Sequence, residues 1–103
     1  MRWNAQVSAL ERLERWYAAR CNGDWEHQYG IHIGTLDNPG WLLKIGLSET
    51  IPEGSILPRT KLGRSEVDWI HYWTEDRTFN AACGAQNLAE TIDIFCDWFD
   101  SLV

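Results

Sequence analysis

The sequence predicts an α+β fold in two layers: an antiparallel sheet of four to five strands with the N-terminal and C-terminal helices packed on one face. Two observations carry this prediction: helical spacing of apolar residues at both ends of the chain, and two-residue alternation between turn signals in the middle. A third is the absence of the strand-helix alternation that a parallel sheet needs. The length of 103 residues fits a single domain spanning 1–103.

Residues 4–20 have the pattern of an amphipathic helix. Charged residues fill the positions between apolar ones that recur at intervals of three and four: Trp3, Val7, Leu10, Leu13 and Tyr17. We expect this apolar stripe to face the sheet. Gly23 ends the helical pattern, because glycine accepts the left-handed backbone that often follows a helix.

The first hairpin is predicted at residues 29–47. Apolar and polar residues alternate over 29–35 and again over 41–47, which is typical of strands with one buried face. The intervening Asp-Asn-Pro-Gly at 37–40 is a turn sequence, because Pro presets φ and Gly accepts a positive φ. We therefore expect Tyr29, Ile31, Ile33 and Trp41 to serve the fold.

The middle of the chain predicts a short edge strand and a second hairpin. Pro and Gly interrupt residues 48–66, so only a short edge strand is expected, around 56–62. Residues 67–74 and 78–83 form two β-rich segments joined by a turn at 75–77. Either Trp69, His71 and Trp73 or Ile70 and Tyr72 face the core; both choices expose a large aromatic ring if the other sheet face is uncovered. Such a patch favours a protein-binding face.

Residues 87–102 predict the last helix. Asn87 and Glu90 have the spacing of a capping box. An apolar stripe follows, and an acidic stripe lies on the opposite side of the helix: Glu90, Asp93, Asp97 and Asp100. Like charges at this spacing repel one another, a cost that is tolerated for solubility or for a basic partner.

Composition narrows the classes of partner. A formal charge of −6 and a pI near 4.9 argue against nucleic-acid binding, which depends on Lys and Arg at phosphates, and favour a basic protein partner. Three cysteines without a paired spacing indicate a reducing compartment. The first residues do not have the pattern of a signal peptide, and no apolar run is long enough to cross a membrane. We expect a cytoplasmic protein without a membrane anchor.

The sequence offers two weak candidates for chemistry. A metal site could draw on Cys21, His27, His32, His71 and Cys83, but these lack the close paired spacing of structural zinc ligands, so no metal or other cofactor is expected. A hydrolase site could use Asp24, Glu26, His27 and Asp37. It lacks a nucleophile motif, and acids in such a loop more often bond backbone amides.

Several motifs together resemble one family. The segment GDWEH-x-YGI-x-I-x-TLDNPGW, a later SE-x-DWIH and a closing NL-x-E-x-I-x-x-F-x-x-W resemble the immunity protein 53 family of bacterial polymorphic toxin systems. The resemblance runs from the tryptophan-bearing first helix to Trp98. It is weakest in the second hairpin, at Tyr72-Trp73 and Ala82-Cys83-Gly84.

The resemblance implies a small antidote without enzymatic activity, which binds a cognate protein toxin domain and neutralises it by stoichiometric occlusion. The acidity suggests that the toxin is basic, for example a nuclease. The predicted toxin contacts are Asp24, Trp25, Glu26, His27 and Asp37, with a second set of Glu90, Asp93, Asp97 and Asp100. Two alternatives stay open: a small hydrolase or ligand-binding domain that uses the loop of Asp24, Glu26 and His27, and a binding module unrelated to toxins. The protein is expected to be a monomer or homodimer.

Overall fold

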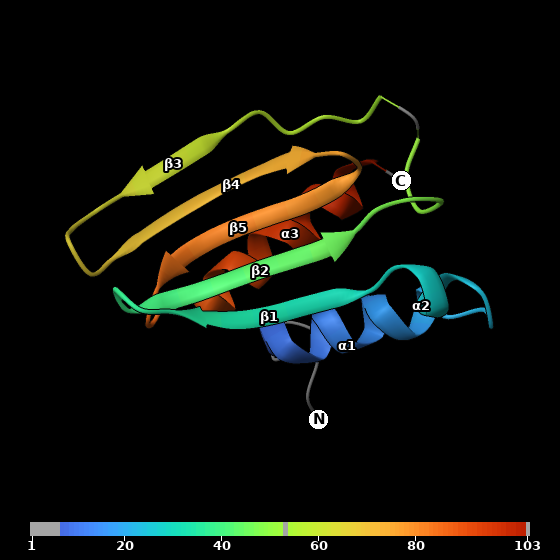
Figure 1. Cartoon of the computed structure of the whole chain (residues 1–103), viewed down its shortest axis with the longest axis horizontal. Coiled ribbons are helices and arrows are strands. Elements are labelled where there is room, and N and C mark those ends of the chain that lie inside the picture. Colours follow the sequence, from blue (N-terminus) through green and yellow to red (C-terminus); the bar gives the residue numbers. More distant parts are fainter. Residues whose placement is uncertain (1–6, 53, 103) are drawn as a thin grey trace.

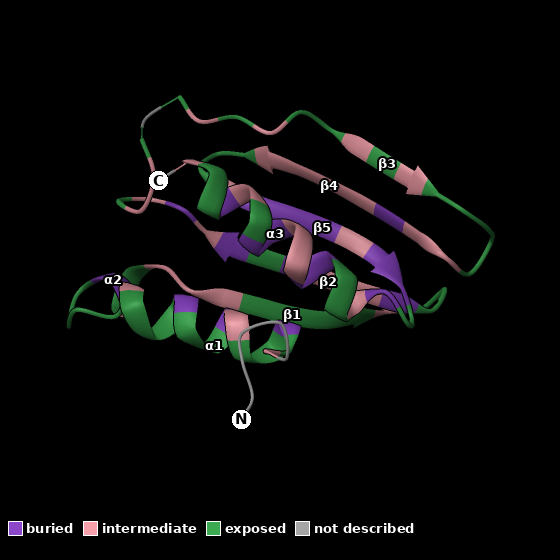
Figure 2. Cartoon of the chain, turned by 180° about the vertical axis from the view of Figure 1, so that it is seen from behind, coloured by how far each residue is buried: buried purple, intermediate pink, exposed green. Residues whose placement is uncertain are grey.

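The computed structural model describes residues 7–52 and 54–102 (Figure 1). Its elements in chain order are α1 (Ala9–Arg20), α2 (Trp25–Gln28), β1 (Ile31–Leu36), β2 (Gly40–Gly46), β3 (Thr60–Gly63), β4 (Trp69–Glu75), β5 (Thr78–Gly84) and α3 (Leu88–Leu102). The strands form one antiparallel sheet in the order β1-β2-β5-β4-β3. Seen from behind, α1 and α3 lie on the same face of this sheet (Figure 2). The predicted α+β fold is confirmed.

Both predicted hairpins are present. The Asp-Asn-Pro-Gly segment joins β1 to β2, with Leu36 opposite Gly40. Gly40 is required there because a Cβ atom would overlap the carbonyl oxygen of Cys83 on the neighbouring strand. In the second hairpin, Glu75 pairs with Thr78 around a two-residue turn in which Asp76 and Arg77 have φ of 52° and 56°. Positive φ at both residues matches the twist of the strands.

The core lies between the sheet and the helices. Ile45, Phe79 and Phe95 are fully buried. The rings of Phe79 on β5 and Phe95 on α3 lie 5.0 Å apart, so α3 packs against the middle of the sheet. Trp16 of α1 completes this cluster by meeting Phe95 edge to face at 5.1 Å.

The helix α1 differs from its prediction in start and in buried side. It begins at Ala9, and Ser8 caps it in a capping box with Glu11; Trp3 and Asn4 lie outside the described residues. The buried residues are Ala9, Leu13 and Trp16, whereas Leu10 and Tyr17 of the predicted stripe are 58% and 39% exposed. Contact with α3 on one flank turns the helix so that the predicted stripe lies partly outside the core.

The edges of the sheet are less covered than its centre. The prediction of a half-buried first strand is only partly right: β1 is an edge strand in which Ile33 is 43% exposed. The short strand predicted around 56–62 is β3, the opposite edge. None of the described helices is long and apolar enough to span a bilayer.

Candidate functional site

The loop of residues 21–28 is held together by its own side chains. The Glu26 carboxylate accepts hydrogen bonds from the amides of Asn22 at 2.9 Å and Gly23 at 2.8 Å. The Asn22 side-chain oxygen accepts the amides of Asp24 and Trp25, both at 2.9 Å. Backbone hydrogen bonds, its own amide first, hold the pKa of Glu26 below its usual value. Both Glu26 oxygens therefore serve the loop, which leaves this carboxylate poorly placed as a catalytic base.

Trp25, one of the predicted toxin contacts, lies in the core and offers almost no surface to a partner. Its exposed fraction is 2%. Its ring meets Trp16 edge to face at 5.7 Å, and its Nε1 donates to the Ser48 carbonyl at 3.1 Å. Burial of this large ring holds the loop against α1 and the end of β2. It contributes more to folding stability than the same ring would if it were exposed to solvent.

Of the other predicted residues at this end, Asp24 and His27 are exposed. Asp37 is exposed too, but it follows the far end of β1, a strand of six residues that spans roughly 20 Å. The four residues of the hydrolase hypothesis therefore do not come together. Within residues 7–52 and 54–102, no three His, Cys, Asp or Glu side chains are grouped so as to hold a metal ion.

Three acids of the α3 stripe surround Arg12 of α1. The guanidinium lies 2.9 Å from Asp93, 2.9 Å from Asp97 and 3.5 Å from Asp100. Hydrogen bonds that Arg12 donates to Asp97 and Asp93 raise its pKa above the usual value. The side chains of Asp97 and Asp100 stay 74% and 72% exposed. This stripe thus joins the two helices while its outer oxygens face solvent.

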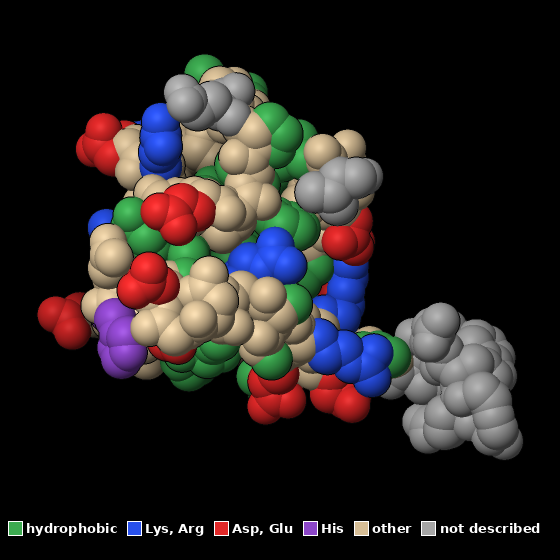
Figure 3. Space-filling view, turned by 90° about the vertical axis from the view of Figure 1, so that its right-hand side faces the viewer, with side chains coloured by type: hydrophobic (Ala, Val, Ile, Leu, Met, Phe, Trp, Pro, Cys, Tyr) green, Lys and Arg blue, Asp and Glu red, His purple; other side chains and the backbone are tan. Residues whose placement is uncertain are grey.

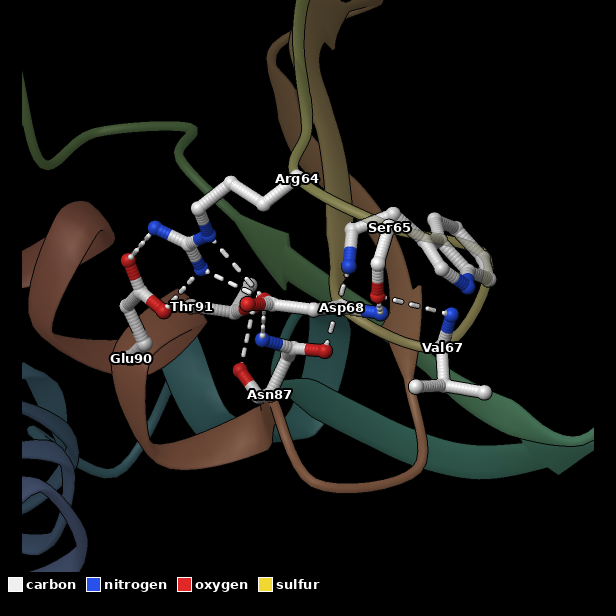
Figure 4. A network of polar contacts seen from close by, with 8 residues as sticks. Arg64, Ser65, Val67, Asp68, Asn87, Glu90 and Thr91 are labelled. Atoms are coloured by element: carbon white, nitrogen blue, oxygen red, sulfur yellow. Dashed lines mark hydrogen bonds and ion pairs between the residues drawn. The ribbon is translucent and has the colours of Figure 1, made fainter.

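The fourth acid, Glu90, belongs to a separate network (Figure 4). Arg64, in the connection between β3 and β4, contacts Glu90 at 2.6 Å and Asp68 at 2.9 Å. Hydrogen bonds donated by Arg64 hold the pKa values of both carboxyls below their usual range. Asn87 donates to Asp68 at 2.9 Å and accepts the amide of Trp69 at 3.3 Å. Through these long-range contacts, Asn87 and Glu90 tie α3 to the start of β4.

The sheet face opposite the helices carries exposed and half-buried side chains from one of the two sets that the alternation over 67–74 left open. Ile70 is buried and Tyr72 packs against the core, so Trp69, His71 and Trp73 point to the uncovered side. Register places Lys61 beside His71, and Lys44 on the same side of β2. We call this surface the open face and define it by six residues: Lys44, Arg59, Lys61, Trp69, His71 and Trp73.

Contacts within the open face order its aromatic side chains. The Arg59 guanidinium carbon lies 4.0 Å from the centre of the Trp73 ring, a cation–π contact. Trp73 Nε1 donates to Glu75 at 3.2 Å, and the Trp69 and His71 rings lie 5.2 Å apart. The sequence signal was present in the alternation of 67–74, but only the position of the helices tells which set is exposed.

The end of the molecule that carries α2 has a mixed surface (Figure 3). Acidic and basic side chains are interspersed there, with apolar side chains visible between them. A hollow of about 690 Å³ opens near this end and is lined by residues from α2, β2 and β5, including His27, Lys44 and Asn80.

Comparison with protein families identifies the chain. The family model described as immunity protein 53 matches residues 10–100, which includes both hairpins, α2 and nearly all of α1 and α3. The chain belongs to the immunity protein 53 family. Neither the curated proteins nor the solved structures contain a match.

Membership of the immunity protein 53 family makes this an immunity protein, a class that binds a cognate toxin. The matched range covers the second hairpin, where the resemblance in sequence is weakest. The open face of this immunity protein therefore lies within the family domain and is not an added segment.

Proposed function

We propose that this protein neutralises its cognate toxin domain by one-to-one binding that occludes the active site or an essential surface of the toxin. The family match over residues 10–100 is the observation that carries this proposal. An ordered two-layer domain with one sheet face uncovered supports it, since such a face can meet a folded partner without rearrangement.

The acids predicted as contacts remain one candidate surface for a basic toxin, such as a nuclease. Asp24, Asp37, Asp97 and Asp100 are exposed, and the chain carries a formal charge of −6. Their carboxylates would speed association with a positively charged partner. The acids of α3 already have salt-bridge partners, so a basic toxin would have to compete with Arg12 for Asp93, Asp97 and Asp100 and with Arg64 for Glu90.

A ligand-binding domain is the second candidate function, and the hollow beside His27 is the observation that favours it. Its lining combines histidine, lysine and amide side chains with the carboxylates of Glu75 and Asp76, a mixture that could hold a small polar molecule. The use of Glu26 in backbone hydrogen bonds weakens the hydrolase version of this alternative.

Coexpression tests the proposed function. The protein is produced together with the C-terminal domain encoded by the adjacent toxin gene, and both cell survival and copurification are measured. We expect survival and a stable one-to-one complex. Cell death without a complex, despite a folded immunity protein, would contradict the proposal for that toxin domain.

A further inference from the structure

We propose that the open face is the surface that docks on the toxin, and that it binds an acidic surface of the toxin domain. This inference rests on the proposed function and specifies its contact. It differs from the expectation drawn from net charge, because it assigns binding to a side of an acidic protein where three cations, Lys44, Arg59 and Lys61, outnumber the carboxylate of Glu75.

Basic side chains are unevenly distributed over the surface of the protein. Both lysines of the chain, Lys44 and Lys61, lie on the open face and are exposed. Among the residues that the structure describes, no carboxylate forms a salt bridge with either lysine or with Arg59. On the helical side, Arg12 and Arg64 are paired with carboxylates and Arg20 lies over the rings of Trp16 and Phe99, whereas the exposed Arg15 forms no salt bridge within the described residues. Lys44 and Lys61, which have no carboxylate partner among the described residues, can bind carboxylates of another protein.

Aromatic and cationic side chains alternate on this face in the combination that dominates binding hot spots. Trp73 is held by Arg59 above it and by Glu75 beside it. Trp69 is held by contact with His71. Rings that are already ordered lose little conformational freedom on binding, so their burial contributes more to affinity.

The shape of the face suits a convex partner. On β5, Ala82, Asn80 and Thr78 form a floor of small side chains, with Trp73 and His71 on one side and Lys44 on the other. The floor continues into the hollow of about 690 Å³. Lys44 and Lys61 lie three strand positions apart, roughly 15 Å, so they can grip two separate carboxylates across this trough.

Matched charge reversals test the inference on the complex obtained by coexpression. Lys44→Glu and Lys61→Glu are made singly and together on the open face, and Arg15→Glu, also exposed, makes the same change of charge on α1. We expect the double variant to raise the Kd for the copurified toxin domain by about 100-fold and Arg15→Glu to change it by about twofold. Wild-type affinity should also fall as salt rises.

The outcomes separate this inference from the proposed function. If wild-type protein binds the toxin and the double variant binds it equally well, the open face is not the docking surface, although the function stands. Loss of binding in Asp97→Lys with Asp100→Lys, without loss in the lysine variants, would likewise overturn it. Lys44→Ala with Lys61→Ala serves as a milder pair if reversal impairs folding, which circular dichroism checks.

Nucleic acid is the other partner that a cationic aromatic face could attract. A fluorescent single-stranded oligonucleotide is therefore titrated against the same variants. Oligonucleotide binding that needs Lys44 and Lys61, combined with toxin binding that does not, would overturn the inference in favour of a nucleic-acid surface.

Discussion

Tryptophan and arginine have different roles on the two faces of the sheet. On the helical side, Trp16 and Trp25 are buried, and Arg12 is surrounded by three carboxylates. On the open face, Trp69 and Trp73 are only half-buried, and Arg59 lies on a ring and not against an acid. The net charge of −6 therefore describes neither face, because pairing within the fold determines which charges remain available to a binding partner.

The largest difference should appear when one tryptophan is removed from each side. Trp25→Ala should lower the free energy of unfolding by about 3–5 kcal/mol, because it empties a buried site against Trp16. Trp73→Ala should lower it by about 1 kcal/mol, since its ring packs on a surface. Urea unfolding of the two variants measures both. Equal losses would show that Trp73 on the open face contributes as much to folding stability as Trp25 in the core.

The next contrast compares a paired cation with an unpaired one. Arg12→Ala should cost about 1–2 kcal/mol, because it leaves Asp93, Asp97 and Asp100 facing one another without their shared partner. Added salt should restore part of this loss by screening the carboxylates. Lys61→Ala should stay within about 0.5 kcal/mol of wild type. Thermal unfolding at low and high salt checks the pair, and a salt-independent Arg12 variant would contradict the electrostatic account.

Acid should weaken the helical side selectively. The pKa values of Glu26, Asp68 and Glu90 are lower in the folded protein than in the unfolded chain. Their contribution to stability is therefore present above about pH 4 and is lost as pH falls through the folded values. Arg64→Ala should flatten this loss, because it removes the cause of two of the shifts. Lys61→Ala should leave the slope of unfolding free energy against pH unchanged between pH 5 and 2, as followed by denaturant titration.

The smallest expected effect is a difference in labelling rate between the buried cysteines and the exposed one. Cys83 and Cys96 are buried, and burial raises the pKa of Cys96 to about 11, whereas Cys21 is exposed. A thiol reagent near neutral pH should modify Cys21 at least about tenfold faster than the other two. Mass spectrometry of the modified peptides measures the order, and early labelling of Cys96 would show that the contact between α1 and α3 opens readily.

Local sequence patterns determined the two long helices α1 and α3, the Asp-Asn-Pro-Gly hairpin, the second hairpin and the short edge strand, but not the short helix α2. Each depends on residues close together in the chain: apolar spacing, alternation, and turn residues with suitable φ. The acidic stripe on α3 was also predictable, since one helix places its members on one side. The family resemblance was carried by the long GDWEH and TLDNPGW segments, and the match over residues 10–100 confirms it.

Tertiary structure alone decided which side of each element is buried and which charges are paired. The sequence predicted Trp25 as an exposed loop residue, but α1 and Ser48 enclose it in the folded protein. It predicted Asn87 as a helix cap, and the fold adds a hydrogen bond from its side chain to Asp68. Arg12 and Asp97 are 85 residues apart in the chain, so no local pattern links them. The same holds for the open face: alternation over 67–74 defines two sets of side chains, and only the docking of both helices on one side of the sheet exposes Trp69 and Trp73. The physical reason is that burial and ion pairing are set by contacts between distant segments, which local periodicity does not encode.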